Sequence, residues 1–289
     1  MNDQAQRLRD LLNQKKNVKE ARTIAVLSGK GGVGKSNFAL NFGIGLAKHQ
    51  KKVILFDLDF GMGNIDVLMG LAPKKTIVNM FNESLSLSEI IETGPYSLSY
   101  VAAGSGLSDL FEMNDLHFEY FVNQLREVAY QYDYIIFDLG AGLQRQHVHF
   151  ALAAHECVVV TTTEPTSITD AYSVLKHLYS ERENISLQLL VNRAVSEKEG
   201  KQTLQRLTKV VKQFLSKDIN SLGFVYDDRS VIDAVKEQTP FLLKNEKSLA
   251  SRSLTAIIDS YLEPTSTEMN RPSHSFVTKL KMLFSRKVE

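Results

Sequence analysis

The stretch "SGKGGVGKSN", residues 28–37, decides the fold of this chain. Residues 29–36 match the pattern G-x-x-x-x-G-K-[ST], whose glycines let backbone N–H groups turn inward around phosphate oxygens. An apolar run, "TIAVLS" at 23–28, precedes the loop, and a helical pattern, "NFALNFGIGLAKH" at 37–49, follows it. A helix N-terminus at this position adds its own partial positive charge. The stretch therefore predicts a nucleotide-phosphate site between a strand and a helix.

Short apolar runs alternate with longer helical patterns along the rest of the chain. The runs are rich in β-branched residues and apolar on both faces, as strands buried between helices are. Expected strands lie at 23–28, 52–57, 96–103, 132–138, 157–162, 187–192 and 222–225. Expected helices lie at 35–48, 115–130, 144–154, 167–180, 197–216, 228–237 and 247–262. The order predicts an α/β fold, a mostly parallel twisted sheet of about seven to eight strands with helices on both faces.

Composition narrows the class of protein further. The 289 residues are 43% hydrophobic and 23% charged, which is typical of a globular chain. The single cysteine, Cys157, excludes a disulfide framework and lies in the apolar run "CVVVT", so we expect it to be buried. The polar start has no signal-peptide core, and no run reaches the ~18 apolar residues of a membrane span. We therefore expect a cytoplasmic protein.

Charge is unevenly distributed, although the net charge is only +1. Residues 1–22 hold six cationic and three acidic side chains, and residues 271–289 hold five and one. Two basic ends thus flank an acidic body, which suggests anionic or acidic partners for the ends. The Pro-, Ser- and Thr-rich stretch before the last helical pattern is typical of a linker. We predict an N-terminal segment at 1–21, a nucleotide-binding domain at 22–262, a linker at 263–273 and a helix at 274–289.

Two lysines and a serine in the loop suggest distinct roles toward ATP and Mg²⁺. Lys35 is expected to reach the β- and γ-phosphates, and the Ser36 hydroxyl to hold Mg²⁺. The expected ATP contacts of the loop are Gly29, Lys30, Gly31, Gly32, Val33, Gly34, Lys35, Ser36 and Asn37. Lys30 is a second lysine that a loop around one triphosphate does not need.

Carboxylates follow two of the predicted strands. Asp57 and Asp59 stand two residues apart after "VILF", so both are expected to face one side at the carboxyl end of the sheet, where α/β folds bind ligands. Asp138 ends the strand "YDYIIFD" and is the expected Mg²⁺-binding carboxylate, directly or through water.

Residues 30–36 also fit K-G-G-x-x-x-K-[ST], and here the sequence resembles the deviant Walker A motif of the MinD/ParA ATPases. The resemblance implies an ATP-switched homodimer in which Lys30 of one chain reaches the partner's site, as a catalytic cation in trans. It also implies that Asp59 activates the attacking water, that Asp57 supports the Mg²⁺ shell and that Gly140 senses the γ-phosphate. Adenine contacts are implied for Asn192, Arg193 and Asp228.

The last helical pattern, "SHSFVTKLKMLFSRKV" at 273–288, is amphipathic. An apolar face bordered by cations predicts a helix that lies in an anionic membrane surface, and the resemblance implies the same. That face comprises Phe276, Val277, Leu280, Leu283 and Phe284. A helix folded back on its own body is the other interpretation, and the two hold together if each belongs to a different nucleotide state. Two such helices in a dimer would bind by avidity.

The N-terminal "DQAQRLR" at 3–9 resembles the D-Q-A-x-x-L-R element of one subfamily, the FlhG (FleN or YlxH) ATPases that govern flagellar number. The resemblance implies that this segment activates the GTPase FlhF and that the protein contacts flagellar C-ring components. The residues that carry it are Asp3, Gln4, Ala5, Leu8 and Arg9. A short helix of this kind folds on its partner.

Two other functions of the same family stay open. A MinD-type division-site ATPase shares the site and the tail, but it starts almost at the first strand, whereas about 20 residues come first here. A ParA-type partition ATPase needs a cationic surface for DNA phosphates, and the acidic body argues against specific nucleic-acid binding. Iron proteins of the same fold need paired cysteines, which one cysteine excludes.

Overall fold

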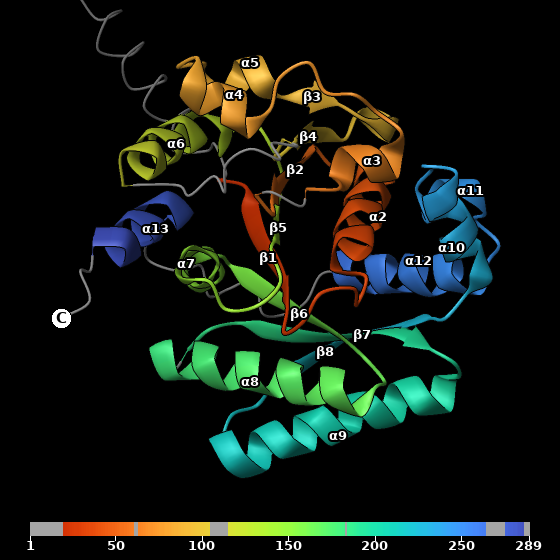
Figure 1. The fold of residues 1–289 in the computed structure, drawn as a ribbon. Coiled ribbons are helices and arrows are strands. Elements are labelled where there is room, and N and C mark those ends of the chain that lie inside the picture. The colour runs from red at the N-terminus through yellow and green to blue at the C-terminus, as the bar shows by residue number, and fades with distance from the viewer. Residues whose placement is uncertain (1–19, 61–62, 105–114, 183, 264–274, 286–289) are drawn as a thin grey trace, which may run out of the picture.

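A computed structural model describes residues 20–60, 63–104, 115–182, 184–263 and 275–285. One eight-stranded sheet crosses the molecule in the order β3-β4-β2-β5-β1-β6-β7-β8, and every neighbouring pair is parallel except β3 with β4 (Figure 1). The strands are β1 (Arg22–Ser28), β2 (Val53–Leu58), β3 (Glu92–Thr93), β4 (Ser99–Val101), β5 (Tyr134–Leu139), β6 (Glu156–Thr162), β7 (Leu187–Ala194) and β8 (Asn220–Tyr226).

Helices cover both faces of the sheet, because alternate residues of each strand face opposite layers. In β1, Ala25 and Leu27 belong to one apolar core, and Ile24 and Val26 belong to the other. The first layer contains α4 (Ile77–Asn82), α5 (Leu87–Ile90), α6 (Asp115–Val128), α7 (Arg145–Ala153), α8 (Pro165–Glu181), α9 (Glu197–Leu215) and α13 (Phe276–Ser285). The second contains α2 (Lys35–Lys48), α3 (Ile65–Met69), α10 (Arg229–Lys236), α11 (Phe241–Lys244) and α12 (Leu249–Leu262).

The predicted fold class is confirmed, and the long elements lie within a few residues of their expected bounds. Cys157 is buried in β6, as expected. The sequence pattern missed the short elements β3, α3, α4, α5 and α11, which have six residues or fewer. Elements of this length carry too few periodic positions to be recognised from apolar spacing.

The C-terminal helix α13 lies against the protein's own body, beside α6 and α7 (Figure 1). Phe276 stacks on Phe137 of β5, and Phe284 stacks on Phe118 of α6. Of the five residues predicted to face a membrane, Phe276, Val277 and Leu280 are buried and the other two are partly buried. The structure therefore corresponds to the folded-back interpretation. Among the described residues, no helix combines the length and apolar character needed to cross a bilayer.

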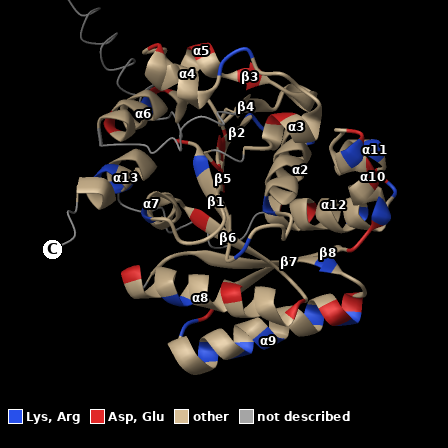
Figure 2. Ribbon diagram, viewed as in Figure 1, with Lys and Arg blue, Asp and Glu red and all other residues tan. Residues whose placement is uncertain are grey.

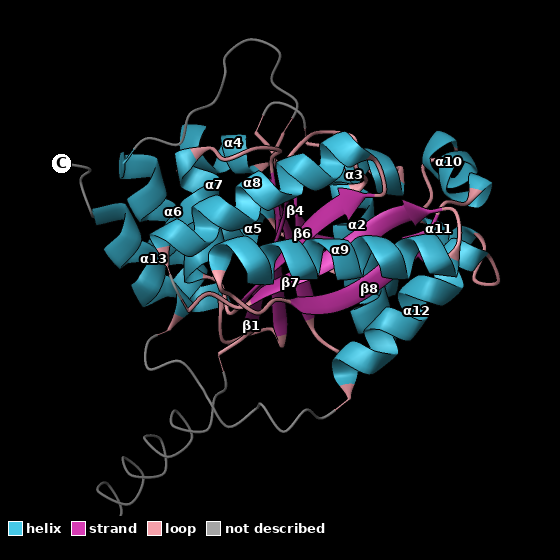
Figure 3. Ribbon diagram, turned by 90° about the horizontal axis from the view of Figure 1, so that it is seen from below, coloured by secondary structure: helices cyan, strands magenta, loops and turns pink. Residues whose placement is uncertain are grey.

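Glu20, which stands two residues before β1, contacts the start of α13. Glu20, the first described residue, accepts backbone hydrogen bonds from Phe276 and Val277. Burial raises the pKa of the Glu20 carboxyl, although these bonds and the nearby Lys279 ammonium act in the opposite direction. β3 forms one edge of the sheet and β8 forms the other. Seen from below, β8 lies between α9 and α12 (Figure 3).

Candidate nucleotide-binding site

The phosphate loop joins β1 to α2 and leaves room for an anion. Gly34 is the N-cap of α2 with φ 88°, and a Cβ there would lie 2.2 Å from the Asn192 side-chain nitrogen. Glycine is thus required both by conformation and by space. A Cβ built on Gly31 or Gly32 would meet nothing within 4 Å. Within the described ranges no side chain caps α2, so its first-turn N–H groups are available to phosphate.

Lys35 and Asp138 form a buried ion pair at the base of the loop. Lys35 Nζ lies 2.6 Å from Asp138 Oδ1 and 3.3 Å from Ser36 Oγ. The other carboxylate oxygen, Asp138 Oδ2, is buried and has no hydrogen-bond partner among the described residues. An unsatisfied carboxylate oxygen close to a serine hydroxyl fits Mg²⁺, which takes oxygen ligands from protein, phosphates and water.

Asp57 pairs in register with Asp138 on the neighbouring strand β5. Burial, followed by the adjacent Asp138 carboxylate, raises the pKa of Asp57 to about 7. Its Oδ1 accepts a hydrogen bond from the Asp59 backbone at 3.1 Å, and Oδ2 accepts from Asn64 at 2.8 Å and from Ile65 at 3.2 Å. Asp57 therefore fixes the loop before α3, and its role toward Mg²⁺ stays a prediction.

Asp59 lies directly after β2 and faces the turn after β5. A Cβ on Gly140 would lie 3.2 Å from Asp59 Oδ1 and only 2.5 Å from His147 Cε1. His147 of α7 hydrogen-bonds the Leu58 backbone, and burial lowers its pKa. Its Nδ1 is buried without a hydrogen-bond partner in the described part of the chain. His147 could not be found from sequence, since it stands outside every motif and only the fold brings it to this turn.

Lys30 has partners within its own chain. Its Nζ lies 3.0 Å from Glu164 Oε2 and 3.1 Å from Thr166 Oγ1, both at the start of α8. The Lys30 side chain is 37% exposed and that of Glu164 is 62% exposed, so this is a surface ion pair. Sequence reasoning did not anticipate Glu164. The role of Lys30 in a partner's site stays a prediction.

Of the three predicted adenine contacts, the side chains of Asn192 and Asp228 are hydrogen-bonded within the chain. Asn192 Nδ2 donates to the Val33 carbonyl at 2.8 Å, which ties β7 to the phosphate loop. Arg193 follows at a register irregularity of β7 with φ 57°, a conformation that non-glycine residues adopt at a cost. Asp228 caps α10, accepting from Ser230 at 2.8 Å, and contacts the Ala250 backbone at 3.3 Å. Their adenine contacts stay predictions.

The predicted partner residues Asp3, Gln4, Ala5, Leu8 and Arg9 lie outside the described residues. Of the loop residues, Gly29 packs against the backbone of Asp170 in α8, Val33 is buried, and Asn37 accepts a hydrogen bond from Asn41 within α2. The structure places Lys35, Ser36 and Asp138 side by side, and their roles toward ATP and Mg²⁺ stay predictions.

Comparison with known proteins identifies the family. A profile described as an AAA domain matches residues 21–191. The antiactivator FleN of Pseudomonas aeruginosa is 33% identical over 84% of this chain and 88% of its own length. The flagellum site-determining protein YlxH of Helicobacter pylori is 35% identical over 82% of this chain and 83% of its own. The chain belongs to the MinD/ParA family of ATPases.

Solved structures share the MinD/ParA fold. MinD of Pyrococcus horikoshii, complexed with Mg-ADP, aligns over 84% of this chain and 96% of its own, with TM-score 0.71 and 19% identity. The MinC:MinD complex of Aquifex aeolicus aligns over 87% and 99%, with TM-score 0.68 and 24% identity. At these identities the likeness shows the fold alone. MinD/ParA membership supports ATPase activity and makes ATP and Mg²⁺ the ligands to test at the loop.

Proposed function

We propose that this protein is an ATPase that dimerises with ATP, associates with the membrane and regulates the number and placement of flagella. The relatives FleN and YlxH support the flagellar role. The observation that carries the ATPase role is the Lys35–Asp138 pair at 2.6 Å beneath a glycine-rich loop, beside a buried carboxylate oxygen without a partner.

ATP would lie in the loop with its phosphates on the first turn of α2. Lys35 would exchange its contact with Asp138 for the β- and γ-phosphates, while Ser36 and Asp138 would hold Mg²⁺, which neutralises charge on the transferring phosphate. Asp59 would orient and deprotonate the attacking water. Gly140 would donate its backbone N–H to the γ-phosphate. Hydrolysis to ADP and phosphate would be slow, because the site is completed only in the dimer.

The second chain would supply Lys30. In one chain this lysine is held by Glu164 and Thr166, and an exposed pair of this kind is worth about 0–1 kcal/mol. Such a weak contact can be exchanged for the phosphate of a facing chain. Mixing a Lys30→Ala chain with an Asp59→Ala chain tests this: each mutant alone would be inactive, and mixed dimers would regain activity in one site only if Lys30 acts in trans.

Membrane attachment would use the apolar face of α13. That face is packed against α6 and α7, so attachment requires α13 to leave its groove. We propose that ATP-dependent dimerisation releases it, which would make the protein peripheral on the inner face of the cell membrane in the ATP state and cytoplasmic otherwise. Truncation after Glu263 should abolish binding to anionic liposomes and retain ATPase activity; retained liposome binding would show that another surface binds lipid.

The N-terminal segment would activate the GTPase FlhF, and flagellar C-ring components would be further partners. The deciding experiment compares the full chain with a chain lacking residues 1–20. Both should hydrolyse ATP, and only the full chain should stimulate GTP hydrolysis by FlhF. Equal stimulation would exclude this role for the segment.

A MinD-type role in septum placement is the second candidate. MinD of Bacillus subtilis is 29% identical over 90% of this chain and 97% of its own length. Capture of a MinC- or MinE-type protein by the ATP-bound chain, without any effect on FlhF, would favour this function over the flagellar one.

A further inference from the structure

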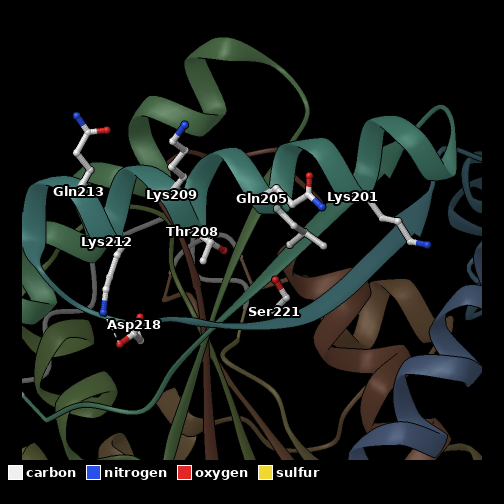
Figure 4. A pocket seen from close by; sticks show the side chains of 9 residues that line it. Lys201, Gln205, Thr208, Lys209, Lys212, Gln213, Asp218 and Ser221 are labelled. Carbon is white, nitrogen blue, oxygen red and sulfur yellow. Dashed lines mark hydrogen bonds and ion pairs between the residues drawn. The ribbon is translucent and has the colours of Figure 1, made fainter.

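A groove runs along α9 beside the edge strand β8, far along the sheet from the phosphate loop (Figure 4). Its volume is about 850 Å³. Leu204 and Thr208 contribute to its floor, and Ser221 of β8 lines the opposite side. Three lysines of α9 line the same groove: Lys201, Lys209 and Lys212. The groove therefore joins a partly apolar floor to a cationic wall.

The positive charge of this wall is only partly paired within the chain. Residues 201–217 contain five cationic side chains and no acidic one, and Figure 2 shows basic residues spaced along α9, with acidic residues at one end of the helix. Lys201 pairs with Glu197, and Lys212 pairs with Asp218 at 2.7 Å, but both lysines stay more than half exposed. Among the described residues, no carboxylate lies within ion-pair distance of Lys209. Exposed pairs contribute little, so a ligand can replace them.

The strand beside the groove has an edge that an extended chain can use. β8 is last in the sheet, and within the described residues no strand pairs with its outer edge. Asn220 and Ser221 are exposed, and the register with β7 shifts near Gly223, whose φ is 141°. An edge strand presents free N–H and C=O groups that bind a further strand.

We propose that this groove binds an extended acidic peptide of a partner protein, which adds to the edge of β8 and places carboxylates against the α9 lysines. Lys201 and Lys212 are eleven residues apart on the helix, or about 16 Å at 1.5 Å per residue. An extended chain spans this distance in about five residues. Side chains two apart share a face of a strand, so the expected ligand carries carboxylates about four or six residues apart on the face toward α9, with the intervening side chains on the other face.

The full chain should be titrated against a fluorescein-labelled Glu-Val-Glu-Val-Glu-Val-Glu peptide, with fluorescence anisotropy as the readout. Lys209→Glu should weaken binding on the order of tenfold, since reversing a contacting charge turns attraction into repulsion. Lys198→Glu is the matched control, because Lys198 lies on the same helix, is exposed and does not line the groove. The affinity of this variant for the peptide should stay within twofold of that of the unmodified chain.

Two further probes separate strand addition from charge attraction. The Gln-Val version of the peptide should bind at least tenfold more weakly, and a version N-methylated at alternate residues should lose affinity although its charge is unchanged. Equal affinity for the Glu and N-methylated peptides would overturn strand addition. Equal weakening by Lys209→Glu and Lys198→Glu would overturn the groove. Binding of a duplex or single-stranded oligonucleotide in place of the peptide, with loss on Lys209→Glu, would assign the surface to nucleic acid and overturn the proposal.

Discussion

Asp57 and Asp138 lie side by side in register on neighbouring parallel strands, and Lys35 Nζ lies 2.6 Å from Asp138 Oδ1. One buried cation thus stands beside two buried carboxyl groups. Lys35→Ala should lower the free energy of unfolding by about 3–5 kcal/mol, because it leaves buried carboxylates without a counter-charge. Chemical denaturation of the nucleotide-free protein measures this, and Lys35→Ala/Asp138→Asn should regain much of the loss. A loss below about 1 kcal/mol would contradict the pairing.

The contact between Gly140 and His147 predicts a strong coupling between the turn after β5 and α7. Gly140→Ala places a Cβ 2.5 Å from His147 Cε1, so it should cost about 1–3 kcal/mol of stability. In Gly140→Ala/His147→Ala the clash is gone, and the double-mutant coupling should reach at least about 1 kcal/mol. Gly31→Ala is the control, since its Cβ meets nothing within 4 Å. Additive effects would show that His147 simply moves aside.

The in-chain partner of Lys30 predicts a variant that dimerises more readily. Glu164→Gln breaks an exposed pair, so stability should change by less than about 1 kcal/mol. With Lys30 free, ATP-dependent dimer affinity should rise a few-fold, because less contact must be given up. Light scattering with a non-hydrolysable ATP analogue measures the dimer. Glu246→Gln, which breaks the exposed pair with Lys48, is the control. Weaker dimers would show that Glu164 belongs to the dimer contact itself.

The buried side chain of His155 leads us to expect that the free energy of unfolding falls in acid. Burial, followed by Lys279 and Arg22, lowers its pKa from 6.5 to about 4, and its Nδ1 accepts from the Thr23 backbone at 3.1 Å. Between pH 4 and pH 6.5 the unfolded chain therefore binds a proton at His155 that the folded chain does not. The stability that neutral His155 contributes is fully present above pH 6.5 and is lost as pH falls toward 4. The total is at most about 3 kcal/mol.

Unfolding free energies of the unmodified chain and of His155→Gln, measured across this range, isolate the effect. The difference between the two should shrink steadily from pH 7 to pH 4, since Gln cannot take up the proton. Parallel pH profiles would mean that His155 is protonated equally in both states.

The phosphate loop, the strand carboxylates and the long helices could be predicted from sequence because each carries a local pattern. Lys35, Ser36 and Asp138 came together because their motifs follow buried strands of one sheet. Glu164 and His147 could not be predicted, since their contacts with Lys30 and Leu58 depend on how α8 and α7 pack over distant strands. Asn192 illustrates the remaining gap: its type and place suggested adenine, while its side-chain nitrogen bonds the Val33 carbonyl.

The aromatic stacking of Phe276 and Phe284 sets a threshold for the proposed anchor. One apolar face cannot be buried in protein and in lipid at once. The measured partition coefficient therefore reports the free energy gained on lipid insertion less the free energy needed to release α13 from α6 and α7. Every 1.4 kcal/mol of packing lowers apparent partitioning about tenfold. A change at Phe118 or Phe137, which would never touch lipid, should therefore shift the lipid concentration at which half of the protein is bound.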